Sequence, residues 1–344
     1  MTSLPQGPNR LRLHNRVRVL EMLLERGRVS RAEIAEHTGI SKVTTTLIVN
    51  ELVEEGLLHE VSKTAGIVGR PAGLVELRPA IGNVVGFDVQ PQALGLIQGN
   101  LRGEILKEET FVLEGSITKA ILRQLETLDS LKQVVVAVPA PVGEDGLPQP
   151  PNSVPEFDAE KVLAWGRRRG VEVVLENDVK LGAVAEHRAG AASQNDNFAL
   201  LAERASGIGL GLLLGGQLYR GERGFGGEIA LVRWPQGRKL TPLEELPPPQ
   251  RETALAQLVS GLAVALDLSL LVVHQDSAGA LSLDLNAALQ ELVPPNVQVV
   301  KSKLGERAPV LGAFLEATRL AQAQLLHCVT VSAPLALPKG RSTR

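Results

Sequence analysis

Four side chains between residues 42 and 50 could contact DNA bases or the DNA backbone. Lys42 can pair with phosphate or guanine, and Asn50 can pair with adenine or phosphate. Thr46 can donate or accept a hydrogen bond, and the methyl groups of Val43 and Thr46 can touch thymine methyls. This chemistry requires the four side chains to share one exposed face, which depends on the element that carries them.

The stretch 30–55 has the features of two short helices joined by a tight turn. Ser30 and Glu33 have the capping-box spacing that favours a helix start, and Gly39 suits a left-handed helix end. Ser41 can cap a second helix that runs to about Glu55. Two helices with a short glycine-containing turn are typical of a helix-turn-helix, whose second helix enters the major groove of DNA.

A helical wheel gives the outward face of the second helix. With Ile48 and Leu52 placed toward the core, Thr44 and Thr45 fall on the same side, and the four candidate reading residues point away. A preceding helix carries Leu13, Val17, Leu20 and Leu24 at helical spacing, with Arg16 and Arg18 off that stripe, and would pack behind the pair. The alternative is a helical hairpin inside a larger core.

The residues after the second helix have the pattern of a wing. Gly56 ends the helix, and residues 57–61 and about 74–77 have the composition of strands. The loop between them carries Lys63 and Arg70, which suit the phosphate backbone or a narrow minor groove. A solvated hairpin is the alternative, but its position favours contact. The candidate DNA-binding residues are Ser41, Lys42, Val43, Thr46, Asn50, Lys63 and Arg70.

Length and composition limit the possible classes of protein. The 344 residues, 44% of them hydrophobic, suffice for about two domains with a sizeable core. The single cysteine, Cys328, excludes an intrachain disulfide and a multi-cysteine metal site. We find neither a membrane-spanning apolar run nor the apolar core of a signal peptide, so we expect a cytoplasmic protein with no membrane partner.

The charge is distributed unevenly along the chain. The first 80 residues carry 11 Lys and Arg against 9 Asp and Glu, a charge of +2, so the remainder carries −4 within a net charge of −2. This basic excess is small for a monomeric DNA binder. It predicts a homodimer, or a higher homo-oligomer, that places two heads on one palindromic double-stranded DNA operator.

From residue 81 the pattern becomes that of an α/β body. Apolar runs and helical periodicity predict strands through Asp88, at about 93–98, after a turn at 99–103, and at 133–138, and helices at 116–129, 251–270 and about 309–327. A glycine-rich hairpin at 208–218 repeats the first one, which indicates two similar halves. The proline-rich segment 246–250 is predicted to be a surface connection.

Nearly the whole chain resembles the ROK family (repressor, open reading frame, kinase). The motifs occur in the family order: GRPA at 69–72, Gly86-Phe87-Asp88, LRGEIL at 101–106, VAVPAPV at 136–142, PN at 151–152, ENDV at 176–179, the glycine-rich run 206–230, and SKLGERAPVLGA at 302–313. The resemblance implies an α/β chain with an N-terminal winged helix-turn-helix at 1–80. An actin-like (ribonuclease-H-like) two-lobed ROK body would follow at 81–200 and 201–344.

In that family the matching Asn, Asp and Glu side chains bind sugar hydroxyls, and the Asp is the general base of the kinases. The resemblance carries these roles to Asn177, Asp178 and Glu228, with Asn152 as a weaker addition. A carboxylate and an amide suit the paired hydroxyls of a sugar. The alternative for the Asn177-Asp178 pair is a helix N-cap at the end of a strand.

Several parts of the family pattern are missing. Leu231 stands where the family has a histidine, and one cysteine cannot form the family zinc site. The kinase phosphate loop is replaced by 88–92, DVQPQ, and the later glycine run by 274–277, HQDS. The glycines of the segment 206–209 suit tight packing. We therefore expect no cofactor, no metal and no kinase activity.

These features predict a DNA-binding transcriptional regulator of carbohydrate metabolism, a repressor, whose body dimerises and senses a sugar-like effector. Two alternatives stay open. One is a sugar kinase with an appended DNA-binding head. The other is a ligand-independent structural regulator, whose body is a dimeriser or a dock for another protein.

Overall fold

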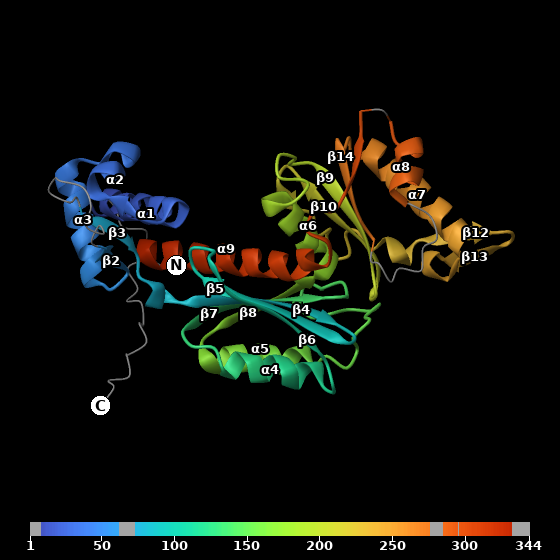
Figure 1. Cartoon of the computed structure of the whole chain (residues 1–344), viewed down its shortest axis with the longest axis horizontal. Helices are drawn as coiled ribbons and strands as arrows, with labels where there is room; N and C mark the ends of the chain where they lie inside the picture. The colour runs from blue at the N-terminus through green and yellow to red at the C-terminus, as the bar shows by residue number, and fades with distance from the viewer. Residues whose placement is uncertain (1–7, 62–72, 276–284, 295, 332–344) are drawn as a thin grey trace.

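The computed structural model describes residues 8–61, 73–275, 285–294 and 296–331 (Figure 1). The N-terminal head holds six elements: α1 (Pro8–Arg26), β1 (Val29–Ser30), α2 (Arg31–Thr38), α3 (Lys42–Glu54), β2 (Leu58–Val61) and β3 (Leu74–Leu77). Its three strands form one sheet in the order β1-β3-β2. This is the predicted winged helix-turn-helix, and the wing-loop residues Lys63 and Arg70 lie outside the described residues.

The helix boundaries of the head follow from local capping, as predicted. The Ser30 side chain accepts from the backbone N–H of Glu33, and the Glu33 carboxylate accepts from the N–H of Ser30 at 2.7 Å. Gly39 ends α2 with a φ of 68°, in the left-handed region that favours glycine. The Ser41 hydroxyl accepts from the N–H of Thr44 at 3.2 Å and caps α3.

The prediction that Arg16 lies off the buried stripe of α1 is wrong. Arg16 is only 8% exposed, and Val19, Leu20 and Leu23 complete the buried face. Its guanidinium donates to Glu51 at 3.2 Å and to Glu55 on the C-terminal end of α3. These carboxylates raise the pKa of Arg16 against the effect of burial, so the side chain stays charged between the two helices.

Two five-stranded sheets form the body. The first has the order β6-β5-β4-β7-β8, and the second has the order β11-β10-β9-β14-β15. The first comprises β4 (Asn83–Gln90), β5 (Ala93–Asn100), β6 (Ile105–Val112), β7 (Leu131–Val138) and β8 (Glu172–Asn177). The second comprises β9 (Phe198–Arg204), β10 (Gly207–Leu214), β11 (Gln217–Leu218), β14 (Leu270–Gln275) and β15 (Gln298–Lys301). Each sheet joins antiparallel hairpin strands to parallel strands, which confirms the two similar halves.

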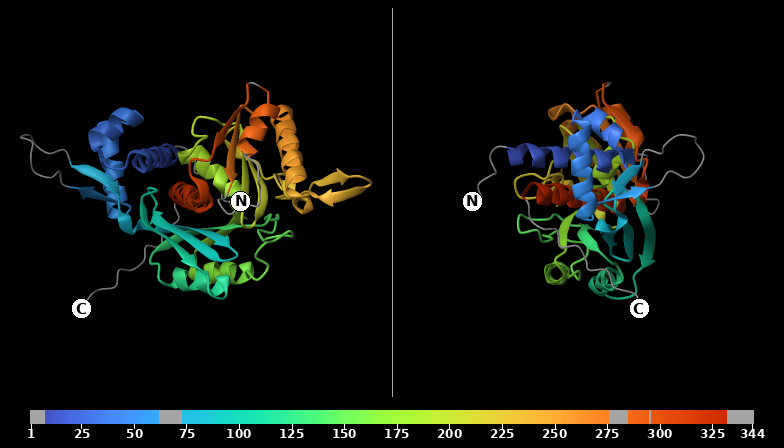
Figure 2. Two further views of the ribbon diagram at one scale, coloured as in Figure 1. Left: turned by 45° about the vertical axis from the view of Figure 1, so that its right-hand side comes forward. Right: turned by 90° about the vertical axis from the view of Figure 1, so that its left-hand side faces the viewer.

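Helices cover both sheets. On the first sheet, α4 (Ile117–Glu126) and α5 (Ala159–Arg169) lie on one face, and α9 (Ala308–Val331) lies on the other (Figure 1). Between the sheets, α6 (Asp178–Ala189) packs against both α9 and β10. The outer face of the second sheet carries α7 (Pro248–Ala265) and α8 (Leu285–Leu292), and a β12–β13 hairpin (Arg233–Gln236, Lys239–Pro242) projects beyond them (Figure 2). Among the described residues no helix combines the length and apolarity that a membrane crossing requires.

Two details differ from the sequence prediction. The helix predicted at 251–270 begins at Pro248 and ends at Ala265. Pro248 and Pro249, which were predicted to lie in a surface connection, form the first turn of α7. A backbone N–H in the first turn of a helix has no intrahelical acceptor, so the missing N–H of proline breaks no hydrogen bond there. The division of the body at 200 remains a proposal: this boundary falls within β9, and α9 packs on the first sheet.

One apolar core joins the head to the body. It runs from Leu20 and Leu23 on α1 to Phe314, Leu325 and Val329 on α9, and it includes buried side chains of the first sheet. Because α1 lies directly against α9, the head shares its core with the first lobe (Figure 2).

Candidate nucleic-acid interface and interlobe cleft

The outward face of α3 carries the predicted reading residues. Val43 is 73% exposed, and Lys42, Thr46 and Asn50 are also exposed. Leu47, at 59% exposure, belongs to the same face and was not predicted, although it stands one helical turn beyond Val43. On the other side of the helix the described core holds Thr45, Ile48 and Leu52, as the helical wheel indicated.

Hydrogen bonds within the head determine which donor and acceptor groups Thr46 and Asn50 can present to DNA. The Thr46 hydroxyl donates to the carbonyl of Lys42 at 2.9 Å, so it presents an acceptor lone pair and a methyl group to solvent. The Asn50 oxygen accepts from Arg31 at 3.0 Å, and Arg31 also donates to Glu60 at 2.6 Å. Arg31 was missed by sequence reasoning, because its contacts lie on α3 and on β2.

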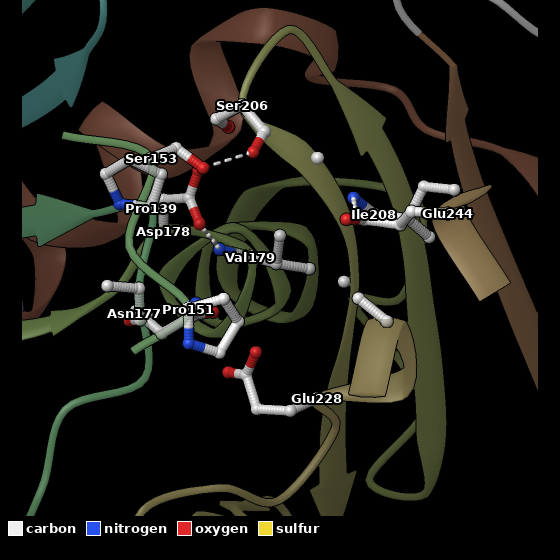
Figure 3. A pocket seen from close by; sticks show the side chains of 14 residues that line it. Pro139, Pro151, Ser153, Asn177, Asp178, Val179, Ser206, Ile208, Glu228 and Glu244 are labelled. Carbon is white, nitrogen blue, oxygen red and sulfur yellow. Dashed lines mark hydrogen bonds between the residues drawn. The ribbon is translucent and has the colours of Figure 1, made fainter. Parts of the chain in front are cut away.

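The second candidate site is a cleft between the two lobes. It encloses about 460 Å³, counting the part open to solvent, and Asn177, Asp178 and Glu228 all line it (Figure 3). Asn152 does not line this cleft, although its neighbours Pro151 and Ser153 do. The Asn152 side-chain oxygen instead accepts from the N–H of Val154 at 2.9 Å.

Asn177 has a structural role at the edge of this cleft. It is the N-cap of α6, and its oxygen accepts from the N–H of Lys180 at 3.0 Å. Its amide nitrogen donates to the carbonyl of Ala140 at 3.3 Å. The alternative prediction, that Asn177 caps a helix, is therefore confirmed, and both the oxygen and the nitrogen of its side-chain amide are hydrogen-bonded within the chain.

Asp178 is held by a buried arginine that the sequence analysis did not single out. Asp178 is 2% exposed, and its carboxylate accepts from Arg204 on β9 at 2.7 Å. The second arm of the Arg204 guanidinium binds Asp88 on β4, also at 2.7 Å. Burial raises the pKa of Asp178, and the charge of Asp88 adds to this effect, while Arg204 opposes it. Both carboxylates thus share one internal cation.

Gln90 adds a further donor to the same two carboxylates. It lies where the resemblance expects a phosphate-binding glycine, and its amide nitrogen donates to Asp88 at 3.2 Å and to Asp178 at 3.4 Å. Among the residues that replace the phosphate loop, Gln90 therefore satisfies the acidic pair, whereas Pro91 and Gln92 are exposed.

The glycine-rich hairpin is also engaged within the chain. The N–H of Ile208 donates to the Glu244 carboxylate at 3.2 Å, so this N–H already has an acceptor within the chain. A Cβ at Gly209 would lie 2.9 Å from Cγ2 of Val179 on α6, and a Cβ at Gly211, just beyond the segment 206–209, would lie 2.7 Å from the Val179 carbonyl oxygen. This close approach of β10 to α6 accounts for these glycines by packing, in line with the sequence-based interpretation.

Glu228 is a second carboxylate in the lining of the cleft whose pKa is raised. Burial raises the pKa of Glu228 to about 7, against an opposing effect of Lys180, with Asp178 and Glu244 adding to the rise. Lys180 is itself buried, which lowers the pKa of its ammonium, and its Nζ donates to the carbonyl of Gly224. A half-buried carboxyl group that titrates near neutrality can either donate to or accept from a ligand hydroxyl.

The zinc ion that the family resemblance implies does not fit this chain. Leu231 is 51% exposed and offers no ligand atom, and the chain has no cysteine in this region. Within the described ranges no three His, Cys, Asp or Glu side chains are placed to hold a metal ion. The β12–β13 hairpin occupies the corresponding stretch of sequence.

Head and body together define a class: a winged helix-turn-helix joined to an actin-like, two-lobed α/β body. A winged helix-turn-helix DNA-binding family model matches residues 12–58, and a ROK family model matches residues 96–235. A winged helix-turn-helix match is thus followed by a ROK family match, in the order that the motifs predicted.

Similar proteins include curated repressors. The xylose repressor of Bacillus subtilis (strain 168) is 28% identical over 229 residues, which cover 62% of this chain and 59% of that protein. The DNA-binding transcriptional dual regulator NagC of Escherichia coli (strain K12) is 25% identical over 234 residues, which cover 64% of this chain and 57% of NagC. The matched region spans less than two thirds of the length of these relatives.

Solved structures share the fold. A ROK family transcriptional regulator, described as a homolog of the E. coli MLC protein, superposes with a TM-score of 0.65 at 18% identity, over 94% of this chain and all of that one. A ROK family glucokinase from Streptomyces griseus, in complex with glucose and AMPPNP, gives a TM-score of 0.54 at 17% identity, over 69% of this chain and all of that one. The body therefore has the fold that ROK regulators and ROK sugar kinases share.

Proposed function

We propose that the protein is a DNA-binding transcriptional repressor of carbohydrate metabolism, active in the cytoplasm as a homodimer. The observation that carries the proposal is the exposed face of α3 beside the winged sheet, with Lys42, Val43, Thr46 and Asn50 directed outward. Similarity to proteins named xylose repressor and N-acetylglucosamine repressor supports this function. A sugar or sugar-derived effector in the cleft between the lobes would then regulate DNA binding.

Phosphoryl transfer is not part of this proposal. In the kinases the residue matching Asp178 must take a proton from a hydroxyl, but here Arg204 and Gln90 hold its carboxylate. The N–H of Ile208, which could bind phosphate, is bonded to Glu244. Because phosphoryl transfer depends almost entirely on positioned phosphates and metal ions, these contacts support a body without catalytic activity.

The first experiment tests DNA recognition by the head. The full-length protein is used to select binding sequences from random double-stranded DNA, and affinities are then measured at several salt concentrations. We expect Lys42→Ala to weaken binding to all sequences about equally and to reduce the salt slope by about two, one for each head of the dimer. Thr46→Ala and Asn50→Ala are expected to change which base is preferred at one operator position. The difference in binding free energy between bases at that position should change by about 1–3 kcal/mol.

A matched control and a clear contradiction belong to this experiment. Lys161→Ala removes an exposed lysine from α5, which lies on the face of the first sheet opposite α9, and should leave both affinity and salt slope unchanged (Figure 1). Failure of the selection to enrich any sequence would refute the proposed function. Equal losses on all sequences from Lys42, Thr46 and Asn50 variants would refute the division between backbone and base contacts.

The second experiment tests the cleft. Calorimetry with neutral sugars and sugar phosphates is expected to give heat for a sugar, and Glu228→Gln should weaken that binding by about tenfold. No heat for any sugar, with operator binding intact, would favour the ligand-independent regulator. A coupled assay with ATP, Mg²⁺ and hexoses that detects turnover, abolished by Asp178→Asn, would establish the kinase alternative.

A further inference from the structure

A buried carboxylate lies where the head meets the body. Glu76 on β3 is 4% exposed, and three side chains bind it. Arg28 Nε lies 2.5 Å from its carboxylate, Arg102 Nη1 lies at 3.0 Å, and His59 Nε2 lies at 3.1 Å. Arg28 and His59 belong to the head, whereas Arg102 lies in the turn between β5 and β6 of the body. Arg102 therefore joins the two parts through Glu76.

The turn that carries Arg102 is fastened to the body. The Asn100 side-chain oxygen accepts from the backbone N–H groups of Arg102 at 2.9 Å and of Glu104 at 3.2 Å. Gln322 on α9 donates to the carbonyl of Leu101 in the same turn at 2.7 Å. A rigid turn on one side and a buried carboxylate on the other limit the rotation of the head relative to the body.

We infer that Arg102 is a positioning residue for DNA recognition: by holding Glu76, it fixes the orientation of the head and so sets the half-site spacing that the protein accepts. This inference rests on the proposed function and on its dimer. In a two-fold dimer, one added base pair moves a half-site by about 3.4 Å and by about a tenth of a turn. A head held by Arg102 cannot follow that change, whereas without this ion pair only the non-directional apolar contacts between α1 and α9, among the described residues, oppose its rotation.

The test uses the full-length protein and operators found by selection, with the distance between half-sites changed by one or two base pairs. We expect the wild type to lose affinity by about tenfold for each such change. Arg102→Ala should flatten this profile to within about threefold, while its affinity for a single half-site stays within about twofold of the wild type. A merely destabilised head would instead lose affinity for the single half-site.

Arg28→Ala is the matched control. It removes a partner of the same carboxylate, but that partner lies within the head, so the link between head and body remains. Its spacing profile should stay as steep as that of the wild type. The inference fails if Arg102→Ala keeps the steep profile, or if Arg28→Ala flattens it equally.

A second measurement decides the matter without any operator. Spin labels at Glu36→Cys on α2 and Lys161→Cys on α5, with Cys328→Ser to remove the native thiol, report the distance between head and body. A narrow distance distribution is expected for the wild type and for Arg28→Ala, and a broad one for Arg102→Ala. A broad wild-type distribution, or an unchanged one in Arg102→Ala, would overturn the inference. Absence of any selected DNA sequence would instead refute the proposed function alone.

Discussion

At the scale of single residues, Arg204 balances two buried carboxylates. Arg204→Met would leave Asp88 and Asp178 in the interior without their cation, so we expect the free energy of unfolding to fall by about 3–5 kcal/mol. Adding Asp88→Asn and Asp178→Asn to Arg204→Met should recover most of this loss, since no unpaired charge then remains buried. Denaturant unfolding of the single and triple variants measures both effects. A stable Arg204→Met protein would contradict this account of the ion pair.

Glu228 predicts a pH dependence of stability. Its pKa in the folded protein is about 7, above the ordinary value of 4.5, so the folded state holds this proton more tightly than the unfolded chain does. The stabilisation is complete below pH 4.5 and is lost as the pH rises through about 7. As the pH rises from 4.5 to about 7, the free energy of unfolding should therefore fall in the wild type but not, for this reason, in Glu228→Gln, so the difference between them should shift in favour of the variant. Unfolding curves at several pH values test this, and a constant difference between the two proteins would contradict it.

At the scale of elements, a glycine on β4 lets α9 lie directly on the first sheet. A Cβ at Gly86 would lie 2.3 Å from the backbone nitrogen of Phe314, whereas a Cβ at Gly95 on β5 would lie 3.4 Å from its nearest neighbours. Gly86→Ala should thus push α9 outward and cost about 1–3 kcal/mol in the free energy of unfolding. Gly95→Ala is the control and should cost less than about 1 kcal/mol. Equal losses would contradict this packing argument.

The elements of the head and several of those of the body could be predicted from the sequence because their signals are local, whereas α5 and the β12–β13 hairpin were not predicted. Each helix cap in the head, at Ser30 and at Ser41, depends on residues three or four positions away, and so does the turn at Gly39. The strands are indicated by alternating or continuous apolar runs. The C-terminal end of α7 was misplaced, because an apolar sequence continues from that helix into β14.

The candidate sites were predictable only in part, for a related reason. Asn177, Asp178 and Glu228 were found through sequence motifs, and they do share one cleft. Arg204 was missed because its partner Asp88 lies 116 positions away, and Arg16 was misplaced because its partner Glu55 lies 39 positions away. A charged side chain is stable in the interior only when a partner compensates its charge, and the sequence does not indicate which distant residue the fold places beside it.

At the scale of the whole molecule, α9 connects regions that the order of the chain keeps apart. Its 24 residues extend over roughly 36 Å at the usual helical rise. Its first residues follow Glu306, which lies 3.6 Å from Arg204 beside the cleft, and its last turns lie against α1 of the head. One helix and one shared core therefore form a continuous packed path from beside the cleft to the head.

This shared core predicts which parts of the molecule unfold together in the native state. Because Leu20 and Leu23 of the head pack in the same cluster as Ala317 and Leu325 of α9, the head should not unfold independently of the first lobe. In native-state hydrogen exchange, the buried amides of α1 should open with the same free energy as those of α9, within about 1 kcal/mol. Arg102→Ala should leave this agreement intact, because it releases an ion pair without removing apolar contacts. Markedly faster exchange in α1 than in α9 of the wild type would mean that the head is an independent folding unit, and the route from the cleft through α9 would then lack its mechanical basis.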